Sequence, residues 1–148
     1  MSGGAFFVLE HLQRLAGHGL AWDLRVPWWH LEEAAEAIAA VPGLAVVVEH
    51  TGLPWDRTEA GLSGWRRGLA ALASLPGVHL KLSEFGLPGA AWDRAGNVGV
   101  IRQALEIFGW QRCMVASNLP VSGLRASLHE IVNTVAAKWF DAVGCREY

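Results

Sequence analysis

The sequence predicts an α/β fold in which parallel strands alternate with helices. Three observations support this: several segments carry apolar residues at helical spacing, short apolar runs of strand length lie between them, and no hairpin turn joins two such runs. Strands that are separated by helices run parallel and are joined by right-handed crossovers. A barrel and an open sheet both satisfy this order, so the pattern alone leaves the choice between them open.

The first half of the chain contains two helices and two strands. A helix is expected over Ala5–Ala16, where apolar residues recur at helical spacing, and Gly17–Gly19 ends it. Leu20–Val26 then indicates a strand, and Pro27 can open the next helix at its first turn. Leu44–Val48 is rich in β-branched residues, which is typical of a parallel strand buried on both faces. The apolar stripe of the helix before it comprises Leu31, Ala34, Ala35 and Ile38.

The second half repeats this alternation. Val78–Ser83 and Cys113–Ser117 have the length and composition of strands. Asn97 and Ser122 can each cap a helix that follows them, because a short polar side chain accepts hydrogen bonds from the first amides of a helix. The stripes of the three helices in this half are Leu62, Trp65, Leu69 and Leu72; Ile101, Leu105 and Phe108; and Leu124, Leu128, Ile131, Val132 and Val135.

Composition and charge narrow the classes of function. The chain has 148 residues, 52% of them hydrophobic, and a formal net charge of −2, which predicts one soluble globular domain over residues 1–148. Such a charge gives no broad positive field, so no nucleic acid and no membrane is expected as a partner. A basic leader and an apolar run of membrane length are both missing, which predicts a cytoplasmic protein. Cys113 and Cys145 have no CxxC spacing and are expected to be reduced thiols.

Polar and aromatic residues follow each of the four predicted strands. They are Trp28-Trp29-His30, Glu49-His50, Ser83-Glu84 and Ser117-Asn118, in chain order. Ligands gather at the carboxyl ends of parallel strands in both barrels and open sheets. We therefore expect these residues to converge on one rim, with His50, Ser83 and Asn118 at the ends of adjacent or near-adjacent strands.

An ordered series of motifs resembles the later half of a known family. A strand-end His-x-Gly at His50, a Trp-Arg-x-Gly helix at Trp65, the Lys-Leu-Ser run Lys81–Ser83 and a Ser-Asn-x-Pro run Ser117–Pro120 occur in that order. From about Phe6 to Ile131 the chain is similar to the amidohydrolase-related (amidohydrolase 2) family of metal-dependent hydrolases, near its fuconolactonase-like and dicarboxylate-lactonase-like branch. The resemblance implies part of a distorted eight-stranded TIM (β/α) barrel whose members hydrolyse lactones, amides or related bonds.

The chain departs from this family at the residues that would hold a metal. The family's opening strand carries a His-x-His pair, which occurs nowhere in this sequence, and Asn118 stands where the last strand of the family ends in an acid. An amide is a weak metal ligand and cannot act as a general base. No cofactor is therefore expected in this chain, although a full-length relative can use a divalent metal such as zinc. His50 would be a metal ligand only if the missing half of the site were supplied.

Each candidate residue also has a purely structural alternative. His79, Lys81 and Ser83 share one face of their strand. If that face lines a barrel interior, Lys81 needs an acidic partner or an anionic substrate, whereas at a sheet edge it would reach solvent. Glu49 beside His50 is either a hydrogen-bond partner of the site or a solvated loop acid.

The residues around the first strand have comparable alternatives. Arg25 can bind a substrate carboxylate through two hydrogen bonds, although a salt bridge within the protein is the commoner role of an arginine. Trp28 and Trp29 can wall a sugar-lactone or aromatic pocket, or they can serve in helix packing or a dimer contact. Asp56 and Arg57 resemble a family loop segment that we expect to be held by an Asp-Arg pair.

Two hypotheses of function follow. The first is a hydrolase of a lactone or similar ester or carbonyl bond in a small carboxylated or sugar-derived substrate, with His50 and Asn118 as catalytic residues. Its substrate-binding residues would be Arg25, Trp28, Trp29, Lys81 and Ser83. The second is a non-catalytic, truncated barrel fragment that folds by self-association. A barrel of this kind takes about 250 residues, so the C-terminal portion alone would leave sheet edges bare, and a two-fold dimer is the simplest way to cover them.

Overall fold

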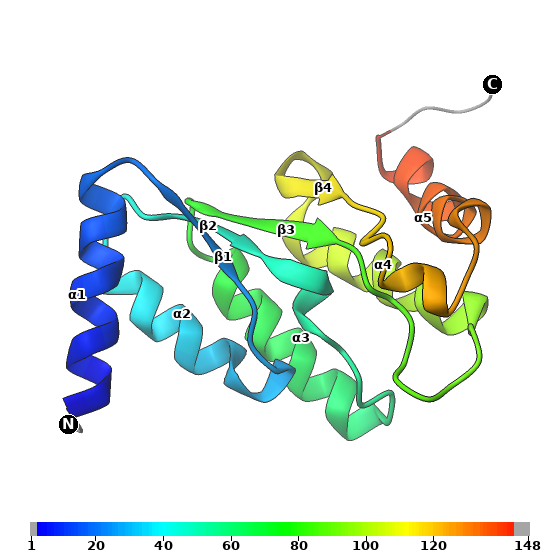
Figure 1. Cartoon of the computed structure of the whole chain (residues 1–148), viewed down its shortest axis with the longest axis horizontal. Helices are drawn as coiled ribbons and strands as arrows, with labels where there is room; N and C mark the ends of the chain where they lie inside the picture. The colour runs from blue at the N-terminus through cyan, green and yellow to red at the C-terminus, as the bar shows by residue number, and fades with distance from the viewer. Residues whose placement is uncertain (1–2, 144–148) are drawn as a thin grey trace.

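The computed structural model describes residues 3–143 and contains a four-stranded parallel sheet with helices between its strands (Figure 1). The strands lie side by side in chain order, and each neighbouring pair is parallel. This arrangement confirms the predicted α/β class and places the first and last strands at the edges of the sheet. The strands are β1 Ala21–Leu24, β2 Ala45–Val48, β3 Val78–Leu82 and β4 Cys113–Val115.

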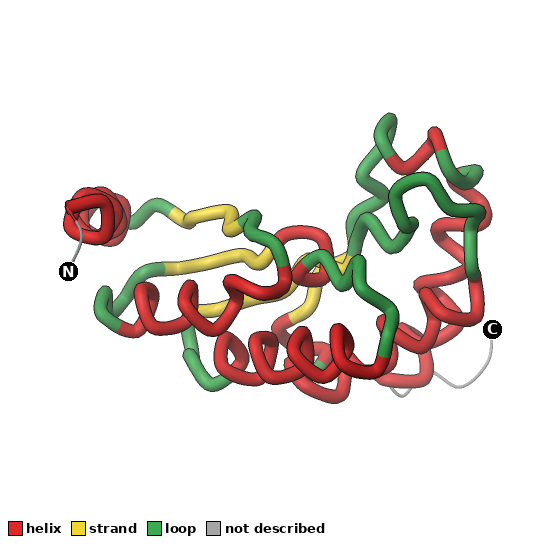
Figure 2. The backbone as a smooth tube through the Cα atoms, turned by 90° about the horizontal axis from the view of Figure 1, so that it is seen from below, coloured by secondary structure: helices red, strands yellow, loops and turns green. Residues whose placement is uncertain are grey.

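The helices cover one face of this sheet. Three of them, α2, α3 and α4, lie below the strands in Figure 2, whereas α1 lies beside β1 and α5 beside α4. Within the described residues, no helix is long and apolar enough to cross a membrane. The α-helices are α1 Gly3–Gly17, α2 Leu31–Ala39, α3 Glu59–Ala73, α4 Arg94–Phe108 and α5 Leu128–Val143. The short 3-10 turns are η1 Trp28–His30, η2 Glu49–Gly52, η3 Trp110–Arg112 and η4 Ser122–Leu124.

The hydrophobic core lies between the sheet and these helices. In β3, alternate residues point to the helices and are fully buried, while His79 and Lys81 lie on the other face and are half-buried. The expectation that Leu44–Val48 is buried on both faces is wrong for the described chain, because Ala45 is exposed and Val47 only half-buried. Burial of the apolar face, at roughly 25 cal/mol per Å², is the main source of stability. Its largest fully buried side chains include Trp65, Leu31, Leu69, Leu72, Leu80, Leu82 and Ile101.

Two of the predicted helix caps are wrong. Asp93, not Asn97, caps α4, where its carboxylate accepts a hydrogen bond of 3.0 Å from Gly96 N. Asn97 lies inside the helix and is buried. Ser127 rather than Ser122 begins the α5 turn: its hydroxyl accepts from Glu130 N at 3.2 Å, and the Glu130 carboxylate accepts from Ser127 N at 3.1 Å. This reciprocal pair is a capping box, and Ser122 instead begins η4.

The expected Asp56–Arg57 pair is also wrong. Asp56 accepts hydrogen bonds from the amide and the hydroxyl of Thr58, the residue that caps α3. Arg57 instead donates to Phe85 O at 2.9 Å, in the loop after β3, and to Asn97 Oδ1 at 3.3 Å, in α4. Burial lowers the pKa of Arg57, and the charge of Asp93 partly offsets this effect. The loop after β2 is therefore braced against the loop after β3.

One of the two cysteines, Cys113, lies within the described residues. Cys113 at the start of β4 is a free cysteine, as predicted, and it is half-buried. Burial raises the pKa of its thiol to about 12, with a smaller opposing effect of Arg112. The Cys113 thiol is therefore protonated at neutral pH and is a poor nucleophile. Cys145 lies outside the described residues.

Helices α2 and α3 approach closely because residue 68 of α3 is a glycine and has no side chain. A Cβ atom at Gly68 would lie 2.5 Å from Cβ of Leu31, which is closer than two carbon atoms can approach. We expect Gly68→Ala to lower the free energy of unfolding by about 1–3 kcal/mol, because it overpacks this contact. The matched control is Gly99→Ala in α4, where an added Cβ meets nothing within 4 Å. This variant should gain about 0.5–1 kcal/mol, and urea denaturation of both would test the argument; an unchanged Gly68→Ala midpoint would contradict it.

Candidate active site at the carboxyl ends of the strands

His50, Ser83 and Asn118 lie at the carboxyl ends of three neighbouring parallel strands. They follow β2, β3 and β4 respectively, and these strands are paired in parallel register. His50 Nδ1 lies 3.0 Å from Ser83 Oγ, and Asn118 Nδ2 hydrogen-bonds the carboxylate of Glu84, the residue after Ser83. The expected placement on one rim is therefore confirmed, whereas the roles of these residues stay predictions.

The backbone of this rim is strained. A left-handed φ is uncommon for residues other than glycine and especially costly for a β-branched side chain such as that of Thr51. Residues of this kind cluster at functional sites, where the surrounding structure holds them in place. All five such residues in the described chain follow β2, β3 or β4: His50 (φ 56°), Thr51 (φ 57°), Leu53 (φ 50°), Glu84 (φ 50°) and Asn118 (φ 52°).

Hydrogen bonds from α3 and β3 hold the turn that carries His50. The Trp65 indole donates from Nε1 to the Thr51 carbonyl at 2.8 Å, and the Thr51 hydroxyl donates to the Ser83 carbonyl at 3.1 Å. Gly52 leaves no free room for a side chain, because an added Cβ would lie 3.1 Å from Leu31 Cδ1. The turn is thus fixed from both sides, and His50 is fixed with it.

His50 is a neutral imidazole near neutral pH. Burial lowers its pKa below the ordinary value of 6.5, and this effect outweighs the nearby Glu49 carboxylate, which raises the pKa. The positive charges of Arg25 and Lys81 lower it further. Glu49 Oε2 lies 3.6 Å from His50 Nδ1, so Glu49 is part of the site and not a solvated loop acid. Because Nδ1 also faces Ser83, the nitrogen left for chemistry is Nε2.

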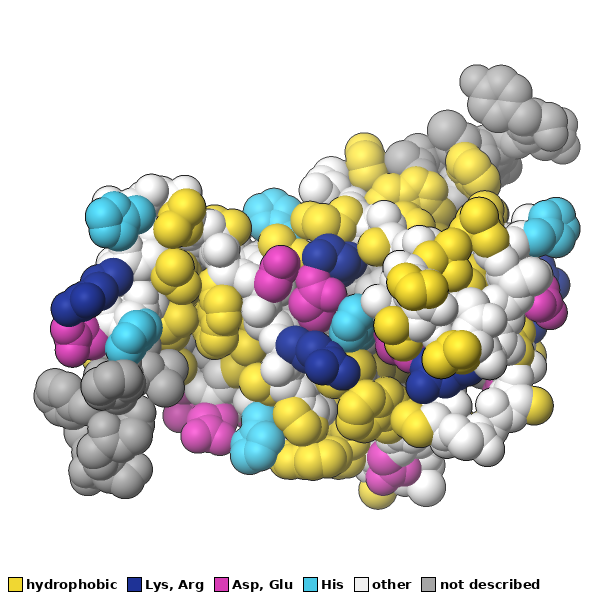
Figure 3. All heavy atoms as spheres, in the orientation of Figure 1, with side chains coloured by type: hydrophobic (Ala, Val, Ile, Leu, Met, Phe, Trp, Pro, Cys, Tyr) yellow, Lys and Arg dark blue, Asp and Glu magenta, His cyan; other side chains and the backbone are white. Residues whose placement is uncertain are grey.

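Lys81 has acidic partners within the chain. Its Nζ hydrogen-bonds the Glu49 carboxylate and lies 3.6 Å from Asp23 Oδ1. The hydrogen bond to Glu49 is the largest of the effects that raise the Lys81 pKa. Of the alternatives for Lys81, the structure therefore shows the acidic partner. Figure 3 shows cationic, acidic and histidine side chains gathered at the centre of the sheet face that the helices leave uncovered.

Glu84 and Arg125 are rim residues whose roles the sequence did not reveal. The Glu84 side chain is only 9% exposed and forms an ion pair with Arg125. Its Oε2 atom also accepts hydrogen bonds from Asn118 Nδ2 and, at 2.7 Å, from Ser122 Oγ. The available signal was an acid directly after a buried strand, but its partners come from the loop after β4, which no local pattern predicts.

The three candidate residues that follow β1 differ in how far they are exposed; they are Arg25, Trp28 and Trp29. Arg25 is exposed and takes part in none of the ion pairs found among residues 3–143, so the salt-bridge alternative for it is not observed. Trp28 packs against α3, where a Cβ at Gly64 would lie 2.6 Å from the Trp28 ring. Trp29 is 58% exposed and meets Trp28 edge-on at 5.6 Å. Trp28 thus packs against α3, while Trp29 and Arg25 are exposed, and the role of all three in substrate binding stays a prediction.

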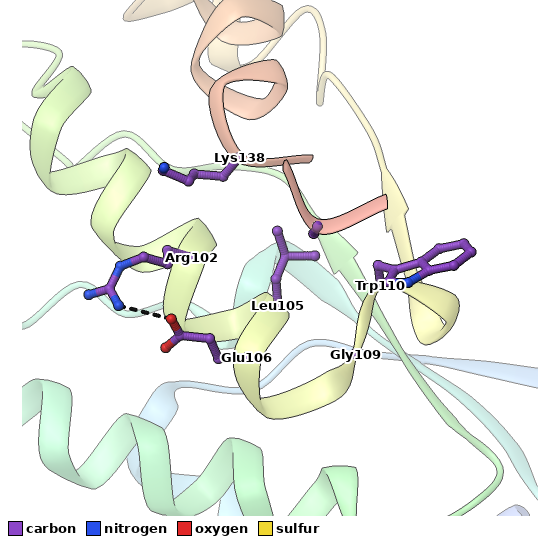
Figure 4. A pocket seen from close by; sticks show the side chains of 7 residues that line it. Arg102, Leu105, Glu106, Gly109, Trp110 and Lys138 are labelled. Atoms are coloured by element: carbon purple, nitrogen blue, oxygen red, sulfur yellow. Dashed lines mark hydrogen bonds and ion pairs between the residues drawn. The ribbon is translucent and has the colours of Figure 1, made fainter. Parts of the chain in front are cut away.

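The described residues do not form a metal site by themselves. Within residues 3–143, no three His, Cys, Asp or Glu side chains converge as a ligand set. His50 offers one nitrogen, while Glu49 is engaged by Lys81. A separate cavity of about 360 Å³ lies between α4 and α5 (Figure 4), but it shares no lining residue with the rim, and its Arg102 is paired with Glu106 at 2.9 Å.

Sequence comparisons identify proteins to which this chain is similar. A family model described as amidohydrolase (Amidohydro_2) matches residues 4–142. An uncharacterized protein of Sinorhizobium fredii is 33% identical over 124 residues, which are 84% of this chain and 41% of that protein. The L-fucono-1,5-lactonase of Burkholderia multivorans is 35% identical over 108 residues, 66% of this chain and 36% of the enzyme. The chain thus spans less than half the length of these curated relatives.

Solved structures show the same fold. An amidohydrolase of Burkholderia multivorans solved with bound zinc superposes with a TM-score of 0.80 at 26% identity, over 95% of this chain and 54% of that one. A putative 2-pyrone-4,6-dicarboxylic acid hydrolase of Pseudomonas putida has a TM-score of 0.62 at 25% identity, over 91% and 48% of the two chains. The sheet and helices therefore correspond to about half of an amidohydrolase-type (β/α) barrel.

The charges around His50 make opposite predictions for two variants. Arg25→Gln should raise the His50 pKa, because it removes a positive charge that disfavours the imidazolium. Glu49→Gln should lower it, because it removes the carboxylate that favours the imidazolium. NMR titration of the ring protons, assigned with His50→Gln, measures both shifts. Arg14→Gln on the exposed surface of α1 is the control and should change nothing; shifts of the same sign in both site variants would contradict this electrostatic account.

Proposed function

The chain belongs to the amidohydrolase family, and on that basis we propose that it is a hydrolase of a lactone or similar ester or carbonyl bond. Its substrate would be a small carboxylated or sugar-derived molecule. The observation that carries the proposal is the convergence of His50, Ser83 and Asn118 on one rim. One relative is named as a sugar lactonase and another as a hydrolase of a dicarboxylic acid, which supports both parts of the substrate class.

His50 would act as the general base. Its lowered pKa leaves the imidazole unprotonated at neutral pH, and no residue of the described chain donates to or accepts from its Nε2 atom. In the proposed step, a water oxygen attacks the substrate carbonyl while Nε2 takes a proton from that water. The ring C–O bond then breaks, and the same proton passes to the leaving alcohol. Ser83 and Glu49 hold the ring through Nδ1.

Arg25 would recognise the carboxylate of the substrate. It is an exposed cation close enough to His50 to affect the imidazole pKa, and it takes part in none of the ion pairs of residues 3–143. A guanidinium can bind a carboxylate through two parallel hydrogen bonds. The exposed Trp29 ring could cover an apolar side of the same ligand. Since the described residues form no metal site, we assign no step to a metal.

The proposal predicts that His50→Gln lowers kcat/KM by about 10²–10⁴-fold, the usual contribution of a general base. His18→Gln is the matched control, because His18 is exposed and precedes the opposite end of β1. The rate of the unchanged chain should fall as the pH drops below 6.5, because protonation of His50 removes the base. Release of acid from L-fucono-1,5-lactone provides the assay. Equal rates for His50→Gln and His18→Gln would refute this role of His50, and no hydrolysis above buffer would count against the function.

A non-catalytic role through self-association is the second candidate, favoured by an apolar surface around β4. Figure 3 shows apolar side chains gathered over β4 and the segment after it. Exposed patches of this kind mark protein contacts, and an unpaired edge strand adds free backbone groups to them. We propose that a second copy of the chain covers this β4 surface. The surface comprises Met114, Val115, Leu119, Val121, Leu124 and Leu128, each at least 38% exposed.

Self-association predicts a two-fold dimer at micromolar concentration that buries more than about 1,000 Å². Leu124 is 86% exposed in the single chain, so Leu124→Glu should shift the equilibrium towards monomer by placing a charge in the contact. Trp110→Glu is the control, because Trp110 is also exposed but belongs to η3. Light scattering after size exclusion measures both variants. A monomeric parent chain would remove this candidate.

A further inference from the structure

The orientation of the Asn118 amide follows from its neighbour. A carboxylate only accepts hydrogen bonds, so the atom of Asn118 that faces Glu84 must be Nδ2. Oδ1 is bonded to the same carbon and is therefore turned away from the carboxylate. No residue of the described chain donates to this Oδ1, and the Asn118 side chain is only partly buried. Asn118 thus keeps one accessible acceptor at the rim.

Glu84 is itself held too firmly to turn away. Arg125 engages its Oε1 atom, and the Ser122 hydroxyl donates to Oε2 at 2.7 Å. Arg125 is in turn packed against the loop after β3, where a Cβ at Gly86 would lie 2.7 Å from Arg125 Cδ. Glu84 and Asn118 both have a left-handed backbone and follow adjacent strands, and their side chains meet in a hydrogen bond. The carboxylate therefore acts as a fixed reference for the amide.

We propose that Glu84 is a positioning residue that presents Asn118 Oδ1 as the acceptor for a hydroxyl group of the substrate. This inference rests on the proposed function and narrows its substrate class to hydroxylated, sugar-derived lactones. It also explains why position 118 carries an amide. An aspartate would put a second carboxylate within hydrogen-bonding distance of Glu84 Oε2, where two like charges repel. Asn118 in this arrangement is a specificity residue, not a base.

The test compares two lactones with a six-membered ring, of which only the first carries hydroxyl groups. L-fucono-1,5-lactone carries hydroxyls, whereas δ-valerolactone carries none. We expect Asn118→Ala to lower kcat/KM for the hydroxylated lactone by about 3- to 10-fold more than for δ-valerolactone, because one hydrogen bond is lost with the first substrate alone. Glu84→Gln should do the same, because glutamine can donate to Asn118 as well as accept and so no longer sets its orientation. The double variant should be no worse than either single one.

Two further measurements separate positioning from general stability. Ser122→Ala removes one donor to Glu84 Oε2 but leaves the Arg125 ion pair and the Asn118 amide in place, so it should change the ratio between the two lactones less than Glu84→Gln does. By NMR, one proton of the Asn118 side-chain amide should be shifted downfield and exchange slowly, and this signature should vanish in Glu84→Gln.

The outcomes distinguish the inference from the proposed function. If both lactones are hydrolysed but Asn118→Ala and Glu84→Gln slow them equally, the inference is overturned and the function stands. If neither lactone is hydrolysed, the proposed function fails and the hydroxyl recognition fails with it. In that case the amide signature alone decides the positioning by Glu84, and an unchanged signature in Glu84→Gln overturns it.

Discussion

One buried hydrogen bond, from the Trp65 indole of α3 to the carbonyl of Thr51, holds the turn that carries His50, on which the candidate site depends. Both residues are at most 1% exposed, so water cannot replace the bond, and its loss would leave a buried polar atom without a partner. The bond holds a left-handed turn at the end of β2 that the chain would otherwise avoid, and His50 is part of that turn. The Thr51 hydroxyl also donates to the carbonyl of Ser83, the residue after β3, so the turn is tied to the end of that strand. One helix residue therefore sets the relative position of two strand ends.

The charges of the rim are arranged so that His50 stays neutral. Glu49 would favour the imidazolium, but its carboxylate is shared with Lys81, and burial outweighs it. On the other side of Ser83, Glu84 is neutralised by Arg125. Ion pairs in such half-buried positions add little net stability, because desolvation offsets their attraction. Their effect here is to fix geometry, and they leave Arg25 as the cation that a ligand can reach.

Local signals predicted much of the fold and the outline of the site. The spacing of apolar residues and the Gly and Pro punctuation determine which segments are helices and strands, and the parallel order then brings His50 and Asn118 to one edge. The partners of the side chains could not be predicted in the same way. Glu84 and Arg125 are 41 residues apart, and they meet only because the loop after β4 folds back over the end of β3. Likewise, the predicted cap of α4 was Asn97, but the helix begins at Arg94 and Asp93 caps it. Asn97 lies within the helix, where its side chain accepts a hydrogen bond from Arg57.

The edge of the sheet and the site are parts of the same segment. β4 ends at Val115, which is 49% exposed, and Asn118 follows three residues later on the same rim. Any strand that paired with β4 in parallel would end beside Asn118, because parallel strands bring their carboxyl ends together. Its strand-end residues would then lie beside Asn118, whose Oδ1 accepts no hydrogen bond from a described residue. A strand that covered the β4 edge in this way would therefore also add residues beside the candidate site, so both hypotheses of function involve the segment that carries Asn118.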